Sequence, residues 1–149
     1  MSDNKTETVH LTQAQDYQFD LHFGDGLPAL RSDEPPPLGQ GQGPSPVQLL
    51  AGAVGNCLSA SLLFALRKFK QAPEPIGAQV VAEVGRNAQG RLRVLSMTAT
   101  LTLGVPAARI EHLERVLSTF EAYCTVTQSV GQGIPITTRV LDAEGRALK

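Results

Sequence analysis

The hydrophobic pattern of the chain alternates with a period of two in three regions, and each of them predicts β-structure. Apolar side chains alternate with polar ones over residues 17–23, which predicts a half-buried strand. A longer alternation over residues 76–103 predicts a hairpin with its turn at residues 87–90. The alternation changes phase at residues 94–95, so we expect a β-bulge there. Residues 134–140 alternate again and predict a closing strand.

Two other segments carry a helical pattern. Residues 45–46 are a serine and a proline, which favour a helix start, and apolar residues surround the following helix on most sides up to Leu66. Pro73 stops any extension of this helix. Residues 106–120 place their apolar side chains on one face and predict an amphipathic helix. Residues 31–46 are rich in proline and glycine, which predicts a long loop.

The order of these elements indicates the fold class. Strands and helices are segregated along the chain, so we expect an α+β fold in a single domain over residues 1–149. Residues 1–15 are expected to form a flexible or edge segment at the N-terminus. A helix that is apolar on nearly all sides is difficult to bury in a small two-layer monomer. We therefore expect a second copy of the chain to cover it in a homodimer.

Composition narrows the function classes. Of the 149 residues, 42% are hydrophobic and 18% are charged, and the net charge is −1. This balance argues against a disordered acidic tail and against a nucleic-acid-binding chain, which normally carries a basic excess. Aromatic residues make up only 5% and there is no tryptophan, so platforms for stacking bases are not expected.

The chain contains no recognisable secretion signal and no convincing membrane span. Residues 1–10 are polar and mixed in charge, unlike a signal peptide. The apolar stretch 46–66 is long enough to cross a membrane, but Gln48, Asn56 and its glycines and serines dilute it. We expect a buried helix of a cytoplasmic protein without a membrane partner, in a compartment that keeps cysteines reduced unless they perform redox chemistry.

The two cysteines are the candidate reactive residues of the chain. Two are too few for a disulfide scaffold or a four-cysteine zinc site, but enough for a redox pair. Cys57 lies inside the predicted buried helix, where a cysteine commonly acts as a small hydrophobe. Cys124 is either a loop thiol without a role or, if a short helix begins there, a thiol with a lowered pKa. They are 67 residues apart, so only the fold decides whether they meet.

Two segments resemble a known family. The segment from Gly43 to Cys57 combines a Ser-Pro helix start, a helix of small residues, and a cysteine eleven residues after the proline. This pattern is similar to the first-cysteine helix of the OsmC/Ohr proteins. Tyr123-Cys124-Thr125-Val126, followed by a closing strand, resembles the second-cysteine segment of the same family. The order of strands and helices also fits from about residue 17 to residue 141.

The resemblance implies both a fold and an activity. The implied fold has antiparallel sheets around a long central helix, in an intertwined homodimer with active sites at the subunit interface. The implied activity is thiol-dependent reduction of hydroperoxides, particularly organic ones, in an oxidative-stress response. Cys57 would attack the O–O bond and become a sulfenic acid, and Cys124 would condense with it to a disulfide. An external dithiol would then reduce the disulfide.

The sequence departs from the family pattern near the first cysteine. Active members pair the attacking thiolate with an arginine, which lowers the thiol pKa, and orient that arginine with a glutamate. Val47 occupies the place of the glutamate, and Gln48 follows it. Arg31 is the candidate arginine, and its alternative role is that of a solvated loop charge. Thr125 replaces the proline that usually follows the second cysteine.

These departures leave a second function open. The same fold could serve as a stress-associated or ligand-binding module that keeps its cysteines reduced. We expect neither a metal nor a cofactor, because the chain's histidines lack metal-ligand spacing and its loop glycines do not follow a strand as in dinucleotide sites. The residues considered for these roles are His10, His22, His112, Gly39, Gly41 and Gly43. Ser59 and Ser61 lack the context of a nucleophilic serine.

Overall fold

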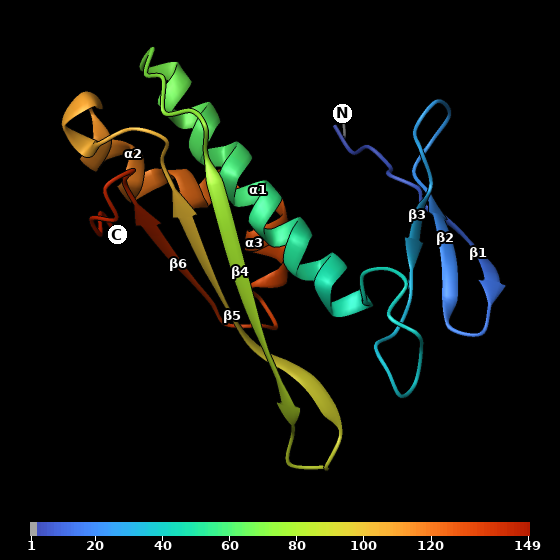
Figure 1. Cartoon of the computed structure of the whole chain (residues 1–149). Helices are drawn as coiled ribbons and strands as arrows, with labels where there is room; N and C mark the ends of the chain where they lie inside the picture. The colour runs from blue at the N-terminus through green and yellow to red at the C-terminus, as the bar shows by residue number, and fades with distance from the viewer. Residues whose placement is uncertain (1–2) are drawn as a thin grey trace. The chain divides into compact units, whose positions relative to one another are not determined.

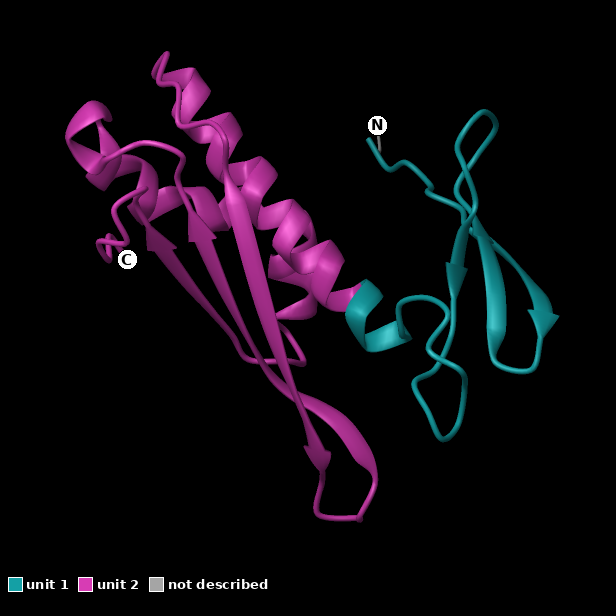
Figure 2. Ribbon diagram, viewed as in Figure 1, with its two compact units in different colours: residues 1–49 teal, residues 50–149 magenta. Residues whose placement is uncertain are grey.

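A computed structural model describes residues 3–149, so Met1 and Ser2 of the predicted N-terminal segment lie outside the described residues. The described chain folds as two compact units, residues 1–49 and residues 50–149 (Figure 2). Each unit contains a three-stranded sheet, and the long helix α1 begins in the first unit and continues into the second. An α+β fold is thereby confirmed.

The first unit is an antiparallel sheet in the order β1-β2-β3 (Figure 1). Its strands are β1 (His10–Gln15), β2 (Gln18–His22) and β3 (Leu30–Ser32). The strand predicted over residues 17–23 corresponds to β2, and Leu21 is its buried apolar side chain. All of β1 is exposed, so the predicted N-terminal segment includes an edge strand.

The loop after β3 is organised by one carboxylate. Asp33 is buried and accepts hydrogen bonds from the backbone N–H groups of Glu34, Gln40 and Gln42 at 2.8, 3.2 and 3.0 Å. These bonds hold the pKa of Asp33 below its usual value, with the contribution of Gln42 the largest. The proline- and glycine-rich segment is thus a defined loop around an ionised aspartate.

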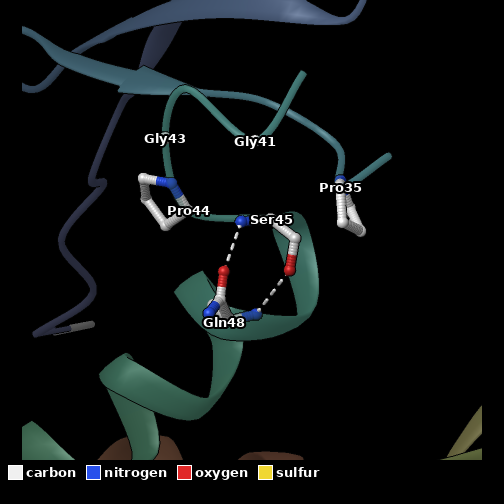
Figure 3. A pocket seen from close by; sticks show the side chains of 6 residues that line it. All are labelled: Pro35, Gly41, Gly43, Pro44, Ser45 and Gln48. Carbon is white, nitrogen blue, oxygen red and sulfur yellow. Dashed lines mark hydrogen bonds between the residues drawn. The ribbon is translucent and has the colours of Figure 1, made fainter. Parts of the chain in front are cut away.

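The start of α1 (Pro46–Lys68) is capped as the sequence predicts. The Ser45 hydroxyl accepts from the backbone N–H of Gln48 at 3.2 Å, and the Gln48 side chain accepts from the backbone N–H of Ser45 at 2.9 Å. This reciprocal capping box satisfies two otherwise unpaired donors (Figure 3). The loop and the cap surround an open hollow of about 540 Å³, lined by Pro35, Gly41, Gly43, Pro44, Ser45 and Gln48.

The second unit contains a mixed sheet in the order β4-β5-β6. β4 (Gly77–Arg86) pairs antiparallel with β5 (Leu92–Thr102), and β6 (Ile136–Leu141) pairs parallel with β5. The expectation of purely antiparallel sheets is therefore wrong for this pair. Helical segments separate β5 from β6 in the chain, and such a crossover lets the last strand return in the parallel direction. The predicted bulge is present, because the strand register skips Leu95.

α1 lies along this second sheet and forms one core with it (Figure 1). Val54, Leu58, Leu62 and Leu66 recur every four residues and are completely buried. Gly55 permits close approach, because a Cβ atom at this position would lie 2.7 Å from a Val80 methyl carbon. Burial of this stripe favours a core helix, although α1 is long and apolar enough to cross a membrane by length and composition alone.

The helix predicted over residues 106–120 is broken into two pieces. A 3₁₀ turn, η1 (Ala107–Arg109), precedes α2 (Leu113–Thr119), and His112 between them has a left-handed φ of 61°. Side chains from other elements hold the break in place. Asp142 accepts the backbone N–H of Ala107 at 2.9 Å, and Gln71 accepts that of Glu111 at 2.9 Å. Such tertiary hydrogen bonds override the helical periodicity of the sequence.

We predict that Leu62→Ala lowers the free energy of unfolding by about 2–5 kcal/mol, because it removes a fully buried side chain and leaves a cavity. Leu38→Ala is the matched control, since Leu38 is 56% exposed, and its effect should stay below about 0.5 kcal/mol. Urea denaturation of both variants measures the difference. Equal effects of the two substitutions would contradict the assignment of the core.

Candidate functional site

Cys57 lies near the middle of α1, where the helix packs on the core of the second unit. Its side chain is half-buried, and it borders the completely buried Leu58. The apolar residues around it explain why the sequence pattern also permits a purely structural cysteine. Cys57 is only partly buried, whereas the neighbouring Leu58 is completely buried.

Cys124 occupies the turn between two short helices. The 3₁₀ helix η2 (Phe120–Tyr123) precedes it, and α3 (Thr125–Val130) follows it with Cys124 as the N-cap residue. The side chain is completely buried in the same core as Phe120. The thiol donates a hydrogen bond to the hydroxyl of Thr127 at 3.0 Å. The helix start expected after Cys124 is therefore present, but the thiol is enclosed.

The environment of Cys124 raises the pKa of its thiol, whereas a helix start at this position was expected to lower it. Burial raises the pKa of the Cys124 thiol above its ordinary value, and the nearby Cys57 thiol raises it further. The hydroxyl and the backbone N–H of Thr127 act in the opposite direction and are outweighed. The expectation of a lowered pKa is therefore wrong, because removal from water dominates over the donors at the start of α3.

The two thiols belong to one site. Both are free and belong to the same hydrophobic core, and Cys57 lies close enough to Cys124 to raise the pKa of its thiol although the two are 67 positions apart in the chain. A pair of adjacent thiols can lose two electrons and two protons to form a disulfide, and a dithiol can reverse the change. The structure thus brings together two of the three predicted site residues.

The third, Arg31, belongs to the first unit, on β3. Its guanidinium forms a two-point ion pair with Asp20 on β2, with N–O distances of 2.6 and 3.1 Å. It also donates to the side-chain oxygen of Gln18 at 3.2 Å. Asp20 and Gln18 were not singled out in the sequence; their positions across an antiparallel pair from Arg31 could have indicated them once β3 was recognised.

A groove of about 210 Å³ lies in the second unit, and neither cysteine is among the residues that line it. Ser61, one turn after Cys57, lines it from α1, and Tyr123, directly before Cys124, lines it from η2. The rest of the lining consists of two phenylalanines, two cationic side chains and three smaller residues: Phe64, Phe69, Lys68, Arg115, Ala65, Val116 and Thr119. Lys68 and Arg115 each stand over a phenylalanine ring, at 5.9 and 5.7 Å from its centre. Within residues 3–149, no cluster of three or more His, Cys, Asp or Glu side chains is arranged to hold a metal ion.

In the Cys57→Ala protein, Cys124 is the only thiol, and we predict that it titrates at a higher pH in the folded than in the unfolded state. Burial, the largest cause of the raised pKa, remains after the substitution. Thiolate absorbance near 240 nm, with and without urea, measures both midpoints. The free energy of unfolding should then fall as the pH rises from the unfolded to the folded midpoint. A folded midpoint at or below the unfolded one would contradict this account.

Solved structures with similar folds cover almost the whole chain. An OsmC-like protein of unknown function from Vibrio cholerae matches with a TM-score of 0.77 and 16% identity, over 93% of this chain and 100% of that one. An organic hydroperoxide resistance protein from Elizabethkingia anophelis, with crystallant-derived thiocyanate bound, matches with a TM-score of 0.73 and 15% identity, over 94% and 98%. A putative organic hydroperoxide resistance protein from Vibrio cholerae, with captopril in one of its active sites, matches with a TM-score of 0.68 and 21% identity, over 99% of both chains.

The sequence itself identifies the family. No curated protein matches the chain. The family model described as OsmC-like protein, however, matches residues 39–139, which include both cysteines and the helix start before Cys57. This match covers well over half of the sequence and agrees with the fold of the solved structures. The chain belongs to the OsmC-like family.

Proposed function

We propose that this chain is a thiol-dependent reductase of organic hydroperoxides, with Cys57 as the attacking and Cys124 as the resolving cysteine. The observation that carries the proposal is the pair of free cysteines that pack in the same core of the second unit, close enough for Cys57 to raise the pKa of Cys124. Membership of the OsmC-like family, together with the hydroperoxide resistance proteins among the similar structures, supports a role of this type. We further propose that it acts in the cytoplasm, where a dithiol reductant is at hand.

The difference in burial supports this division of roles. Cys57 is half-buried and Cys124 is completely buried, so in this proposal the incoming hydroperoxide meets Cys57 first. The Cys57 thiolate attacks the terminal oxygen of the hydroperoxide, the O–O bond breaks, and the alkoxide takes up a proton and leaves as an alcohol. Cys57 is now a sulfenic acid. Cys124 attacks its sulfur, a disulfide forms, and water leaves; an external dithiol then restores both thiols.

In this proposal the groove of the second unit favours an organic rather than an inorganic substrate. Phe64, Phe69 and Tyr123 offer apolar surface there, and Tyr123 directly precedes Cys124 in the chain. Burial of an alkyl or aryl group on such a surface is favourable by roughly 25 cal/mol per Å². Hydrogen peroxide, which lacks this group, would gain nothing from the groove.

Arg31 is the proposed cation of the reaction. Resemblance to the family gives it this role, and the two-point ion pair with Asp20 supports it, because a carboxylate fixes the plane of the guanidinium. In this proposal Asp20 and Gln18 take the orienting role that the family's glutamate would have at Val47.

A second candidate function, a ligand-binding module with permanently reduced thiols, is favoured by one observation. The raised pKa of Cys124 makes its thiolate scarce near neutral pH. Such a module would bind ligands in the groove without oxidation of either cysteine. The oxidation experiment below distinguishes the two functions.

We predict that cumene hydroperoxide converts the reduced protein to a Cys57–Cys124 disulfide, with loss of both thiols and of two hydrogen atoms from the intact mass. Cys57→Ser should abolish the reaction. Cys124→Ser should stop it at a Cys57 sulfenic acid, which dimedone traps and mass spectrometry detects. Persistence of both thiols in the original protein would refute the reductase and favour the binding module.

We also propose that two copies of the chain associate. A stripe on α1 that faces away from the core remains exposed, and it consists of Gly52, Ala53, Asn56, Ala60 and Phe64. Four large apolar side chains of the β4–β5 hairpin are also exposed by 41–58%: Val81, Val84, Leu92 and Leu95. Exposed apolar surface on this scale is typical of protein interfaces.

Light scattering at micromolar concentration should therefore give twice the chain mass of 15.9 kDa. Ala60→Glu places a charge on the exposed stripe of α1 and should weaken the association at least tenfold. Ala143→Glu introduces the same charge at an exposed turn near the C-terminus and serves as the control. A monomeric mass of the unmodified protein would refute the dimer.

A further inference from the structure

Thr127 is the polar side chain that touches Cys124. Its hydroxyl oxygen lies 3.0 Å from the Cys124 sulfur, and both residues are buried, Thr127 with 7% exposure. The two residues are joined through the first turn of α3 (Thr125–Val130), so the helix fixes their separation. Val126 and Val130 of the same helix pack on the core and leave the hydroxyl in a largely apolar environment.

This contact can serve either protonation state of the sulfur. In the structure the thiol is the donor and the hydroxyl oxygen is the acceptor. A hydroxyl group rotates freely and can donate as well as accept, so it can turn its proton toward a thiolate at the same distance. Hydrogen bonds to a charged acceptor are about twice as strong as neutral ones. The hydroxyl therefore favours the charged sulfur over the neutral one.

We propose that Thr127 is the positioning residue of the resolving cysteine: its hydroxyl holds the Cys124 sulfur toward Cys57 and stabilises the thiolate that closes the disulfide. The proposal rests on the function proposed above. The opposing effects on Cys124 support it, because burial and Cys57 raise the pKa of this thiol while the hydroxyl of Thr127 lowers it. Without the hydroxyl, a buried thiolate would keep only the weaker contribution of the Thr127 backbone N–H.

The step that Thr127 assists is the second half of the cycle. Cys124 gives up its proton, and its sulfur attacks the sulfur of the Cys57 sulfenic acid. The S–S bond forms as the S–O bond breaks, and the departing hydroxide takes up a proton to become water. The oxidising equivalents come from the hydroperoxide that formed the sulfenic acid. Attack on the hydroperoxide by Cys57 precedes this step and does not involve Thr127.

The experiment compares two isosteric substitutions on the same helix. Thr127→Val removes the buried hydroxyl, and Thr125→Val is the matched control at an exposed position. We expect Thr127→Val to slow disulfide formation at least tenfold at neutral pH, with an unchanged rate of sulfenic acid formation, so that dimedone-trappable sulfenic acid accumulates. The pH midpoint of disulfide formation should rise. Thr127→Ser, which keeps the hydroxyl, should restore both the rate and the midpoint.

A second measurement tests Thr127 without any hydroperoxide. In the Cys57→Ala background, the absorbance titration of Cys124 should shift to higher pH with Thr127→Val and remain in place with Thr127→Ser. Thr127→Ala, also without a hydroxyl, replaces the valine variant if that variant does not fold. The same titration midpoint with and without the hydroxyl would overturn the proposal. An unreactive parent protein that still shows the expected shift would refute the reductase while the effect of Thr127 on the sulfur stands.

Discussion

Packing of α1 against the sheet of the second unit is the constraint on which the rest of the site depends. The completely buried stripe from Val54 to Leu66 fixes the rotation of the helix about its axis. Gly55 lets the helix approach Val80 closely, which also fixes its distance from the sheet. Once the rotation of α1 and its distance from the sheet are fixed, Cys57 lies at the border of the core. The turn before α3 places Cys124 in the same core. The thiol pair is therefore a consequence of core packing and needs no local cysteine motif.

The same packing sets a conflict between position and reactivity. Burial of Cys124 holds its sulfur beside Cys57, but it also raises the pKa of the thiol and disfavours the thiolate that a disulfide-forming step uses. Donors close to the sulfur are the available compensation inside a core. The Thr127 hydroxyl accepts from the Cys124 thiol in the structure, and by rotation it can become such a donor, since it lies 3.0 Å from the sulfur and is shielded from solvent. With this donor, the Cys124 sulfur can be held in place by burial and still form a thiolate.

The sequence predicted those elements whose signals are local and repeated. Period-two patterns located β2, the β4–β5 hairpin and the bulge at Leu95, and the Ser-Pro start located α1. The hydrophobic pattern did not predict strand β1, because all its side chains are exposed and do not alternate. It did not predict the break before α2 either, because side chains of Gln71 and Asp142, distant in sequence, hold that break. The acidity of Cys124 was misjudged for a similar reason. Its neighbours in sequence suggest a helix start, whereas its burial depends on residues far along the chain.

The presence of Val47 in place of the family's glutamate is a weaker argument against an oriented arginine once the partners of Arg31 are known. A carboxylate after the helix-opening proline would matter if it were needed to orient the guanidinium. Asp20 already does this through two hydrogen bonds across the β2–β3 pair, and Gln18 adds a third. The substitution at Val47 therefore does not leave the arginine without an orienting carboxylate. If the proposed reductase activity proves slow, the burial of Cys124 is a better-supported physical cause than the loss of that glutamate.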